Sequence, residues 1–269
     1  MNHKTSLAIG MMAMLCTMLA GESTGVPAGA SPARKIVVIK ADDMRAIHPN
    51  WDRFFFHAKE KDIKVSVGIF GNSIESPSNE YAIWLKKSIE DGRVEYWNHC
   101  WDHEKWGTKE APTWEYCGSG YEHQKAHFER TQAAGRKLGF TFRIFGAPYN
   151  QMDADTVRVI NESPDIQGVF IRPGKDKEVD AALSGKVLLP MHSWILKGEA
   201  KGTGKPDSAQ FQKDYSILTP KGDVTMMALQ FHPTFFTEQG FTEYEAIIDF
   251  LKKEGWEFLL PSEFAALKK

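Results

Sequence analysis

The stretch that decides the fold is KIVVIKADD, residues 35–43. Its first six residues form a short β-branched run, which is typical of a buried strand. Asp42 and Asp43 follow that run directly. An Asp-Asp pair by itself is common in turns and helix caps, but in parallel α/β proteins the ends of strands also carry sites. The stretch therefore predicts a first strand and a candidate site at its end.

Strand-like and helix-like segments alternate along the rest of the chain. We expect further strands over residues 65–70, 94–97, 141–145, 169–172, 187–189, 225–231 and 256–260, and helices over residues 51–61, 81–91, 121–138, 153–161 and 243–254. Residues 197–214 are polar and contain Gly, so we expect an exposed loop there. Repeated strand–helix units imply parallel strands with crossover helices, and seven or eight of them favour a barrel. An open doubly wound sheet is the alternative, although no Gly-rich dinucleotide fingerprint follows the first strand.

The composition is that of a globular protein. Hydrophobic residues make up 42% of the chain and charged residues 25%, which argues against long disorder. The formal net charge is −2 with acids and bases mixed, and no basic stripe indicates nucleic-acid binding. Aromatic residues reach 12%, including eight Trp. They either fill a large core or partly line a sugar site, where a flat ring stacks on a pyranose.

The pattern of residues 1–30 is typical of a signal peptide. Lys4 gives a positive start, and residues 7–20 form an apolar run that is too short to cross a bilayer comfortably. Ala28-Gly29-Ala30 fits an A-x-A cleavage site. We therefore expect a secreted or periplasmic protein with one domain, residues 31–269, and no later membrane-spanning segment.

Three cysteines bear on export. Cys16 lies in the apolar run behind bulky residues, so plain secretion is favoured over a lipid anchor. Cleavage would leave Cys100 and Cys117, which could form a disulfide in an exported protein or stay as thiols. The sequence leaves both alternatives open, because it does not show how close the two residues lie.

Polar clusters follow four of the expected strands. They are Asp42-Asp43, Asn98 to His103, Gly146 to Asn150, and His232-Pro233. In a barrel of parallel strands these clusters would converge on one face, whereas ordinary solvated loops would scatter polar residues among strand starts and ends alike.

Two histidine pairs have metal-ligand spacing. His99 and His103 lie at i and i+4, so on one helical turn they would share a face and could bind one ion. Two His and one carboxylate leave positions open for water and substrate, as a catalytic metal requires. His123 and His127 have the same spacing, but we expect that pair to lie on a solvated helix face.

Taken in order, these motifs resemble those of the polysaccharide deacetylases, the NodB-homology group or carbohydrate esterase family 4. The resemblance rests on Asp42-Asp43, on His99 and His103, on Pro148-Tyr149 and on Leu229-Gln230-Phe231-His232. It spans residues 35–264. It implies an α/β fold, a distorted (β/α)7 barrel of seven strands.

The resemblance also implies roles. Asp42 is similar to the family's general base, and Asp43, His99 and His103 to its metal ligands. The backbone N–H of Tyr149 resembles the oxyanion donor, and His232 the general acid. One divalent metal ion is implied, with Zn²⁺ as the default. These roles suit amide or ester hydrolysis, which needs an activated water, a stabilised oxyanion and a proton for the leaving group.

The chain departs from the family pattern at several positions. Met44 stands where Gly is usual, and Cys100 where a small hydroxyl residue is usual. Gly146 occupies the place of an Arg that orients the base, for which Arg45, Arg143 and Arg172 are candidate substitutes. The fourth motif is not recognisable, and residues 192–194 (HSW) are a candidate for it.

The sequence therefore predicts a metal-dependent hydrolase that removes N- or O-linked acetyl groups from a glycan. We expect Trp101, Trp106, Trp114 and Asn150 to contact that substrate, and no protein partner. Two alternatives stay open. One is a hydrolase of another amide, such as a small cyclic amide, on the same barrel. The other is a non-catalytic carbohydrate-binding relative.

Overall fold

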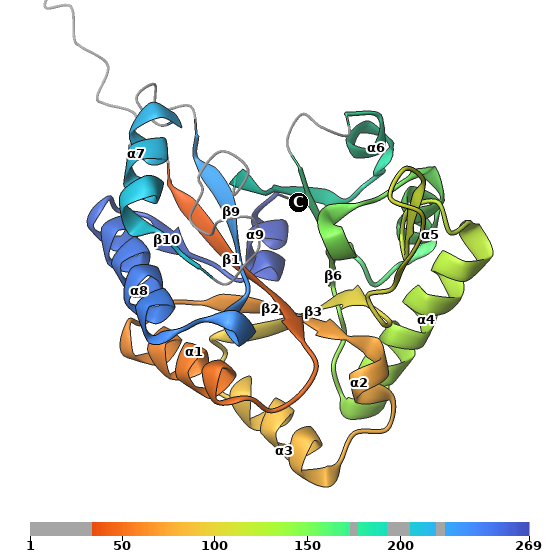
Figure 1. Cartoon of the computed structure of the whole chain (residues 1–269), viewed down its shortest axis with the longest axis horizontal. Helices are drawn as coiled ribbons and strands as arrows, with labels where there is room; N and C mark the ends of the chain where they lie inside the picture. Colours follow the sequence, from red (N-terminus) through yellow and green to blue (C-terminus); the bar gives the residue numbers. More distant parts are fainter. Residues whose placement is uncertain (1–33, 173–176, 193–204, 219–223, 269) are drawn as a thin grey trace, which may run out of the picture. The chain divides into compact units, whose positions relative to one another are not determined.

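Parallel strands surrounded by helices make up the computed structural model, which describes residues 34–172, 177–192, 205–218 and 224–268 (Figure 1). The expected signal peptide, residues 1–30, lies outside these ranges. Within them, no helix combines the length and the apolar character needed to cross a membrane.

Seven parallel strands of the described residues form a nearly closed barrel. They are β1 (Ile36–Met44), β2 (Val65–Phe70), β3 (Val94–Cys100), β6 (Ile144–Phe145), β7 (Gly168–Ile171), β8 (Val187–Pro190) and β9 (Met226–Phe231). Their order is β9-β1-β2-β3-β6-β7-β8. A parallel bridge between Met191 and Ala228 joins the end of β8 to β9 and closes the circuit. This confirms the predicted α/β class and the distorted (β/α)7 barrel.

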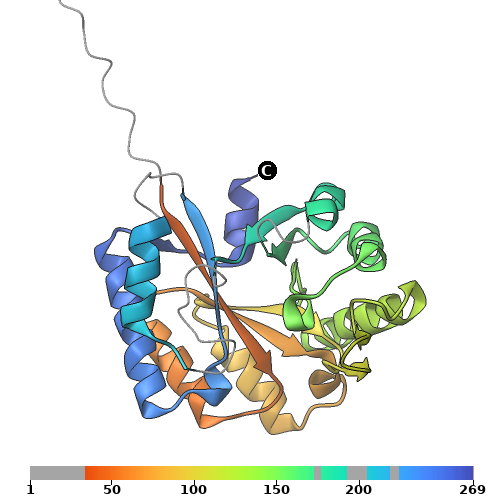
Figure 2. The same ribbon diagram turned by 45° about the horizontal axis from the view of Figure 1, so that its top comes forward.

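Helices pack on the outside of the strands. They are α1 (Pro49–Glu60), α2 (Gly71–Glu75), α3 (Asn79–Ser88), α4 (Tyr121–Leu138), α5 (Ala154–Glu162), α6 (Lys177–Ala182), α7 (Ser208–Leu218) and α8 (Glu238–Lys253). The last helix, α9 (Pro261–Leu267), instead contributes a side chain to the cluster inside the barrel. In both ribbon views, α1, α7 and α8 lie side by side next to β1 and β9 (Figures 1 and 2). Of the loop expected over residues 197–214, residues 197–204 lie outside the described ranges, and the prediction of a loop is wrong from Ser208 onward. There α7 forms because Phe211 and Tyr215, one helical turn apart, are buried.

Shorter elements complete the chain. A two-stranded antiparallel sheet, β4 (Lys105–Gly107) with β5 (Pro112–Trp114), lies within the long loop that follows β3. A short strand, β10 (Glu257–Phe258), pairs with the start of β1. Two 3₁₀ turns, η1 (Pro148–Asn150) and η4 (Pro233–Phe235), follow β6 and β9.

Side chains along β1 alternate between two environments. Val37, Ile39 and Ala41 belong to the apolar cluster under the helices, whereas Ile36 and Val38 belong to the cluster inside the barrel. Because strand side chains alternate with a period of two, Lys40 and Asp42 continue the inward series. The first strand thus carries two charged side chains into the interior, where both are buried.

A tryptophan fills the interior beside these charges. Trp97 of β3 is fully buried, and two glycines make room for its indole. A Cβ added at Gly68 would lie 2.4 Å from the ring, and one at Gly146 would lie 2.8 Å from it. Phe264 of α9 joins the same interior cluster. The interior is therefore a packed core, and the absence of a side chain at position 146 is a packing requirement.

The strands are irregular at their C-terminal ends. Between Ala41 and Met44, β1 has one residue more than the paired stretch of β2. Beside Phe70 the same happens in β3, where His99 is the extra residue. Bulges of this kind re-aim side chains next to functional sites. Here they fall on Asp42-Asp43 and on His99.

We predict that His57 makes the stability of the protein depend on pH. This core residue of α1 packs on Tyr244, with 5.2 Å between the ring centroids, and neither ring nitrogen has a partner. Burial, with Lys61 nearby, lowers the pKa of His57 to about 4. Because the unfolded chain binds the proton more tightly, stability is fully present above about pH 6.5 and falls as the pH drops toward 4.

Urea unfolding as a function of pH tests this prediction. In the wild type, His57 contributes at most about 1.4 kcal/mol per pH unit to the slope of the free energy of unfolding against pH. His57→Leu should remove that contribution. An unchanged slope in the variant would contradict the assignment.

Candidate metal and acid–base site

The four polar clusters converge at the C-terminal ends of the strands. Asp43, at the end of β1, lies at their centre. Its Oδ1 is 3.2 Å from Nε2 of His99 and 3.5 Å from Nε2 of His103, and its Oδ2 is 3.9 Å from Nε2 of His232. Three imidazoles from two different strand ends thus surround one carboxylate, as the sequence predicted for one face of a barrel.

Asp43, His99 and His103 form a suitable donor set for a metal ion. One ligand atom from each lies within 4.8 Å of the others. Nδ1 of His99 lies 2.6 Å from the carbonyl oxygen of Gly146, to which it can only donate. That hydrogen bond fixes the ring of His99 with Nε2 facing Asp43, which is the arrangement found behind ligating histidines. The residues present therefore fit a divalent ion.

The charges at this site favour metal-binding protonation states. Burial raises the pKa of Asp43, but the hydrogen bond with His99 and the positive charge that the three imidazoles can carry outweigh it, so the net pKa is well below its usual value. Burial and the neighbouring His99 lower the pKa of His103 to about 4. At neutral pH the site thus presents a carboxylate and a neutral imidazole, the forms that bind metals.

The two histidines meet in a different way from the one expected. His99 is in β3, and His103 is in the turn beyond it with a positive φ of 67°, so they do not share a helical turn. The bulge at His99 and the left-handed turn at His103 bring their ring centroids to 5.3 Å. A spacing of four residues predicted the proximity, but its helical explanation was wrong.

Adjacent Asp42 and Asp43 point in different directions, as expected for neighbours on a strand. Asp42 is 2% exposed and faces the barrel interior. Nζ of Lys40 donates to its Oδ1 at 2.7 Å and also contacts Oδ2. Nε2 of Gln230 donates to Oδ2 at 2.6 Å. Nδ2 of Asn150 in turn donates to Oε1 of Gln230, so Asn150 is linked to Asp42 through one side chain.

Lys40 is the cation that sequence reasoning missed. Arg143 is exposed at the start of β6, the end opposite to Gly146, and Arg45 is exposed with its guanidinium over Phe70. Arg172, the third candidate, is buried directly after β7. The Lys40 ammonium contacts Asp42 directly and lies 4.9 Å from the ring centre of Trp97. A charged residue two positions before Asp42, within an otherwise apolar strand, was the available signal.

Aromatic side chains surround His103. Phe70 stacks on its imidazole at 5.2 Å between ring centroids, and the ring of Tyr149 lies 4.3 Å away. Tyr149 is 42% exposed, so its ring forms part of the open surface beside the site. Both Tyr149 and Asn150 have positive φ values, 56° and 53°. Such strained backbone in side-chain-bearing residues is common at functional sites.

The three tryptophans expected to contact substrate differ in accessibility. Trp101 is buried, and the guanidinium of Arg130 lies 3.8 Å from its ring centre, which leaves little surface for a sugar. Trp106 is 39% exposed and packs edge-on against His123. Trp114 is half-buried, with the ammonium of Lys105 near its ring. Trp106 offers the largest open ring of the three.

Two further sequence features are placed by the structure. Cys100 is a free and fully buried thiol, so the disulfide with Cys117 that the sequence allowed is not formed. Burial raises the pKa of the Cys100 thiol well above its usual value, which makes it unreactive. Of the candidate fourth motif, His192 contacts the carbonyl of Pro190 through Nδ1, and residues 193 and 194 lie outside the described ranges.

A second cluster of titratable residues lies behind the site. We call Asp102, Glu115 and His127 the second cluster; their ligand atoms also lie within 4.8 Å of one another. Burial would raise the pKa of Glu115, but the contact with His127 and two backbone N–H groups bring it below its usual value. His127 therefore takes part in a partly buried network, which differs from the solvated helix face we expected.

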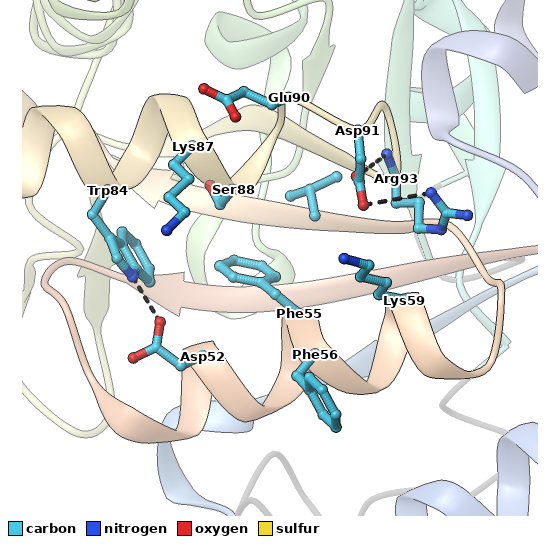
Figure 3. A pocket seen from close by; sticks show the side chains of 11 residues that line it. Asp52, Phe55, Phe56, Lys59, Trp84, Lys87, Ser88, Glu90, Asp91 and Arg93 are labelled. Atoms are coloured by element: carbon cyan, nitrogen blue, oxygen red, sulfur yellow. Dashed lines mark hydrogen bonds and ion pairs between the residues drawn. The ribbon is translucent and has the colours of Figure 1, made fainter.

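A groove on the outside of the barrel is unrelated to these residues. It has a volume of about 370 Å³ and lies between α1 and α3, with Phe55, Trp84 and Arg93 among its lining residues (Figure 3). Val94, the first residue of β3, also lines it, whereas His99 is near the other end of that strand. The groove therefore runs along the outer helices, and none of the residues of the polar clusters lines it.

Comparisons with known proteins identify the fold. No protein-family model and no curated protein matches the sequence. Among solved structures, the chain is similar to a family 4 acetyl xylan esterase from Clostridium thermocellum in complex with a cobalt ion. The identity is 16% and the TM-score 0.57, over 87% of this chain and 92% of that one.

Two further structures have the same fold. The peptidoglycan deacetylase PdaC from Bacillus subtilis is 13% identical with a TM-score of 0.54, over 89% of this chain and 94% of that one. A pseudoenzyme of carbohydrate esterase family 4 (CE4) from Bacillus anthracis is 13% identical with a TM-score of 0.55, over 87% and 66%. The chain therefore has the α/β barrel fold of the CE4 deacetylases, a fold that also occurs in a pseudoenzyme.

We predict that one Zn²⁺ ion binds at Asp43, His99 and His103. A ligand that binds only the folded state increases the free energy of unfolding, by about 2.7 kcal/mol at a concentration of 100 times Kd. The melting temperature of the protein rises as a result. Asp43→Asn and His99→Gln should lose this shift, because each removes a ligand. His123→Gln, a change outside the donor set, is the control and should keep it. An equal shift in all variants would place the ion elsewhere.

Proposed function

We propose that this protein is a secreted or periplasmic, metal-dependent hydrolase that removes acetyl groups from a glycan, and that it is a member of the CE4 deacetylases. The observation that carries the proposal is the pairing of two adjacent carboxylates with different surroundings. Asp42 is buried against a cation, and Asp43 lies among three imidazoles. Separate environments of this kind suit separate roles in one reaction.

Asp43, His99 and His103 would hold the divalent ion, which when bound supplies a Lewis acid for the acetyl carbonyl and for the attacking water. Asp42 takes the proton as the water oxygen forms its bond to the acetyl carbon. Lys40 and Gln230 fix both oxygens of Asp42, so the carboxylate meets the water in one orientation. The backbone N–H of Tyr149 donates to the oxygen that becomes negative.

His232 completes the reaction as the acid. The bond between the acetyl carbon and the glycan nitrogen or oxygen breaks, and the imidazolium gives its proton to that atom. The products are acetate and a free amine or hydroxyl group. Nε2 of His232 lies on the Oδ2 side of Asp43, whereas His99 and His103 lie on the Oδ1 side, which agrees with a role distinct from theirs.

Binding without turnover is the second candidate function. It is favoured by one observation, the likeness to a CE4 pseudoenzyme. The full set of Asp42, Asp43, His99, His103 and His232 at one site supports turnover instead, because a binding protein needs no base and acid around a metal-ligand set.

Acetate release tests the proposal. We expect the Zn²⁺-loaded wild-type protein to release acetate from at least one acetylated polysaccharide in a panel that includes xylan, chitin oligomers and peptidoglycan. Asp42→Asn should abolish release while Zn²⁺ binding survives, because the three proposed ligands remain. Sugar binding with no acetate from any member of the panel would favour the binding function.

We further predict that Lys40→Met lowers kcat by about 100-fold and leaves KM and Zn²⁺ affinity nearly unchanged. The physical reason is that Asp42 loses the group that fixes its orientation, and small displacements of a reacting group cost about this much. The variant also leaves a buried carboxylate without its counter-charge, which costs about 3–5 kcal/mol of stability.

A double variant separates the two effects. Lys40→Met combined with Asp42→Asn removes both charges, so its stability should return toward that of the wild type while turnover is abolished, as in Asp42→Asn alone. If Lys40→Met keeps the wild-type kcat, Lys40 has no part in positioning the base.

A further inference from the structure

The proposed ligand His103 depends on an unusual backbone conformation. Its φ of 67° lies in the left-handed region, which residues with side chains seldom adopt and which persists only where the surroundings enforce it. The turn follows β3 directly and has no helical hydrogen bonds to hold it. Something other than local secondary structure must therefore keep the imidazole directed at Asp43.

A buried carboxylate holds this turn from behind. Glu115 is fully buried, and its Oε1 accepts the backbone N–H of Trp101 at 2.6 Å. Its Oε2 accepts the N–H of His103 at 2.7 Å and that of Asp102 at 3.4 Å. Three successive N–H groups converging on one anion form a nest, which fixes the backbone that supplies them.

Glu115 is itself anchored from two directions. Its backbone N–H donates to the carbonyl of Glu104 at 3.2 Å, and its carbonyl accepts the hydroxyl of Ser119 at 2.7 Å. Nδ1 of His127, on α4, lies 3.2 Å from Oε1. The carboxylate is thus attached to the loop around it and to a long helix, so it can resist movement of the turn.

These contacts also decide what the second cluster does. A carboxylate has about four lone-pair positions, and each oxygen of Glu115 already has two donors beside it: Trp101 and His127 at Oε1, Asp102 and His103 at Oε2. A cation would have to displace them. The second cluster is therefore a support for the turn and not a second metal site.

We propose that Glu115 is the positioning residue for His103, and that it sets the metal affinity of the site through the backbone of residues 101–103. The inference rests on the proposed metal site, because it takes His103 as a ligand. Glu115 is not one of the proposed ligands; its effect passes through three hydrogen bonds to the turn.

The test compares Glu115→Gln with Asp153→Asn. Asp153 is a matched control: its carboxylate also accepts backbone N–H groups, that of Gly118 at the far end of the same loop and that of Thr156 in α5. Zn²⁺ affinity is measured by competition with a chromogenic chelator. We expect Glu115→Gln to bind Zn²⁺ about 10–100-fold more weakly, the range found for residues that support metal ligands. Asp153→Asn should bind within about twofold of the wild type.

A second variant and a second measurement keep the test decisive. Glu115→Asp keeps the charge but is too short to reach all three N–H groups, so it should weaken Zn²⁺ binding less than Glu115→Gln. In the metal-free protein, amide exchange at Trp101 and His103 should be faster in both Glu115 variants than in Asp153→Asn. Wild-type Zn²⁺ affinity in the Glu115 variants would overturn the proposal.

Failure of the proposed metal site would look different. A wild-type protein that binds no Zn²⁺ would refute the metal site and, with it, any effect of Glu115 on affinity. Amide exchange would then still report whether Glu115 holds the turn.

Discussion

The alternation of side chains along β1 is the constraint on which the site depends. A strand inside a closed barrel has one face toward the helices and one toward the interior, and each second residue must enter that interior. In β1 the inward series begins with Ile36 and Val38 and ends with Lys40 and Asp42. Two opposite charges occupy consecutive inward positions, where neither side chain is solvated, so each charge is compensated by the other. The ion pair also holds the Asp42 carboxylate at the mouth of the barrel.

The same interior explains why the charge comes from β1. Trp97 takes up the space beside Gly68 and Gly146, so the loop after β6 has no room for a long cationic side chain at position 146. The ammonium of Lys40 lies over the rings of Trp97 and Phe170, 4.9 Å and 5.5 Å from their centres. The two aromatic rings pack closely around the ammonium and stabilise it by cation–π interactions. Gly146 leaves space for Trp97, and Lys40 provides the positive charge for Asp42 that a side chain at position 146 could not provide.

Backbone strain gathers where the side chains must converge. Asp43, His103, Tyr149 and Asn150 all have positive φ, and the bulges of β1 and β3 fall on Asp42-Asp43 and His99. Regular strands would send alternate residues to opposite faces and keep neighbouring ligands apart. The extra residues of the bulges and the left-handed turns redirect the ligand side chains toward one another. Buried groups such as Glu115 hold the backbone in this conformation. The strain is thus a local cost of assembling ligands from separate strand ends.

The sequence by itself determined the barrel, because the strand–helix alternation and the apolar runs are local patterns that fix element types. It also placed Asp42, Asp43, His99, His103 and His232 at strand ends, where a parallel barrel brings side chains together. The tertiary structure decided what contacts them. Lys40 was recognisable only once the inward face of β1 was known, and Glu115 only once the loop had folded back under β3. Likewise, Ser208–Leu218 forms a helix although the polar composition of the segment suggested a loop. The reason is that the side chains of Phe211 and Tyr215 are buried in the core. Lys40 left a local signal, a charge two positions before Asp42 in an apolar strand, but its partner became evident only from the fold. The contacts of Glu115 join residues up to 14 positions apart, and no local pattern in the sequence records them.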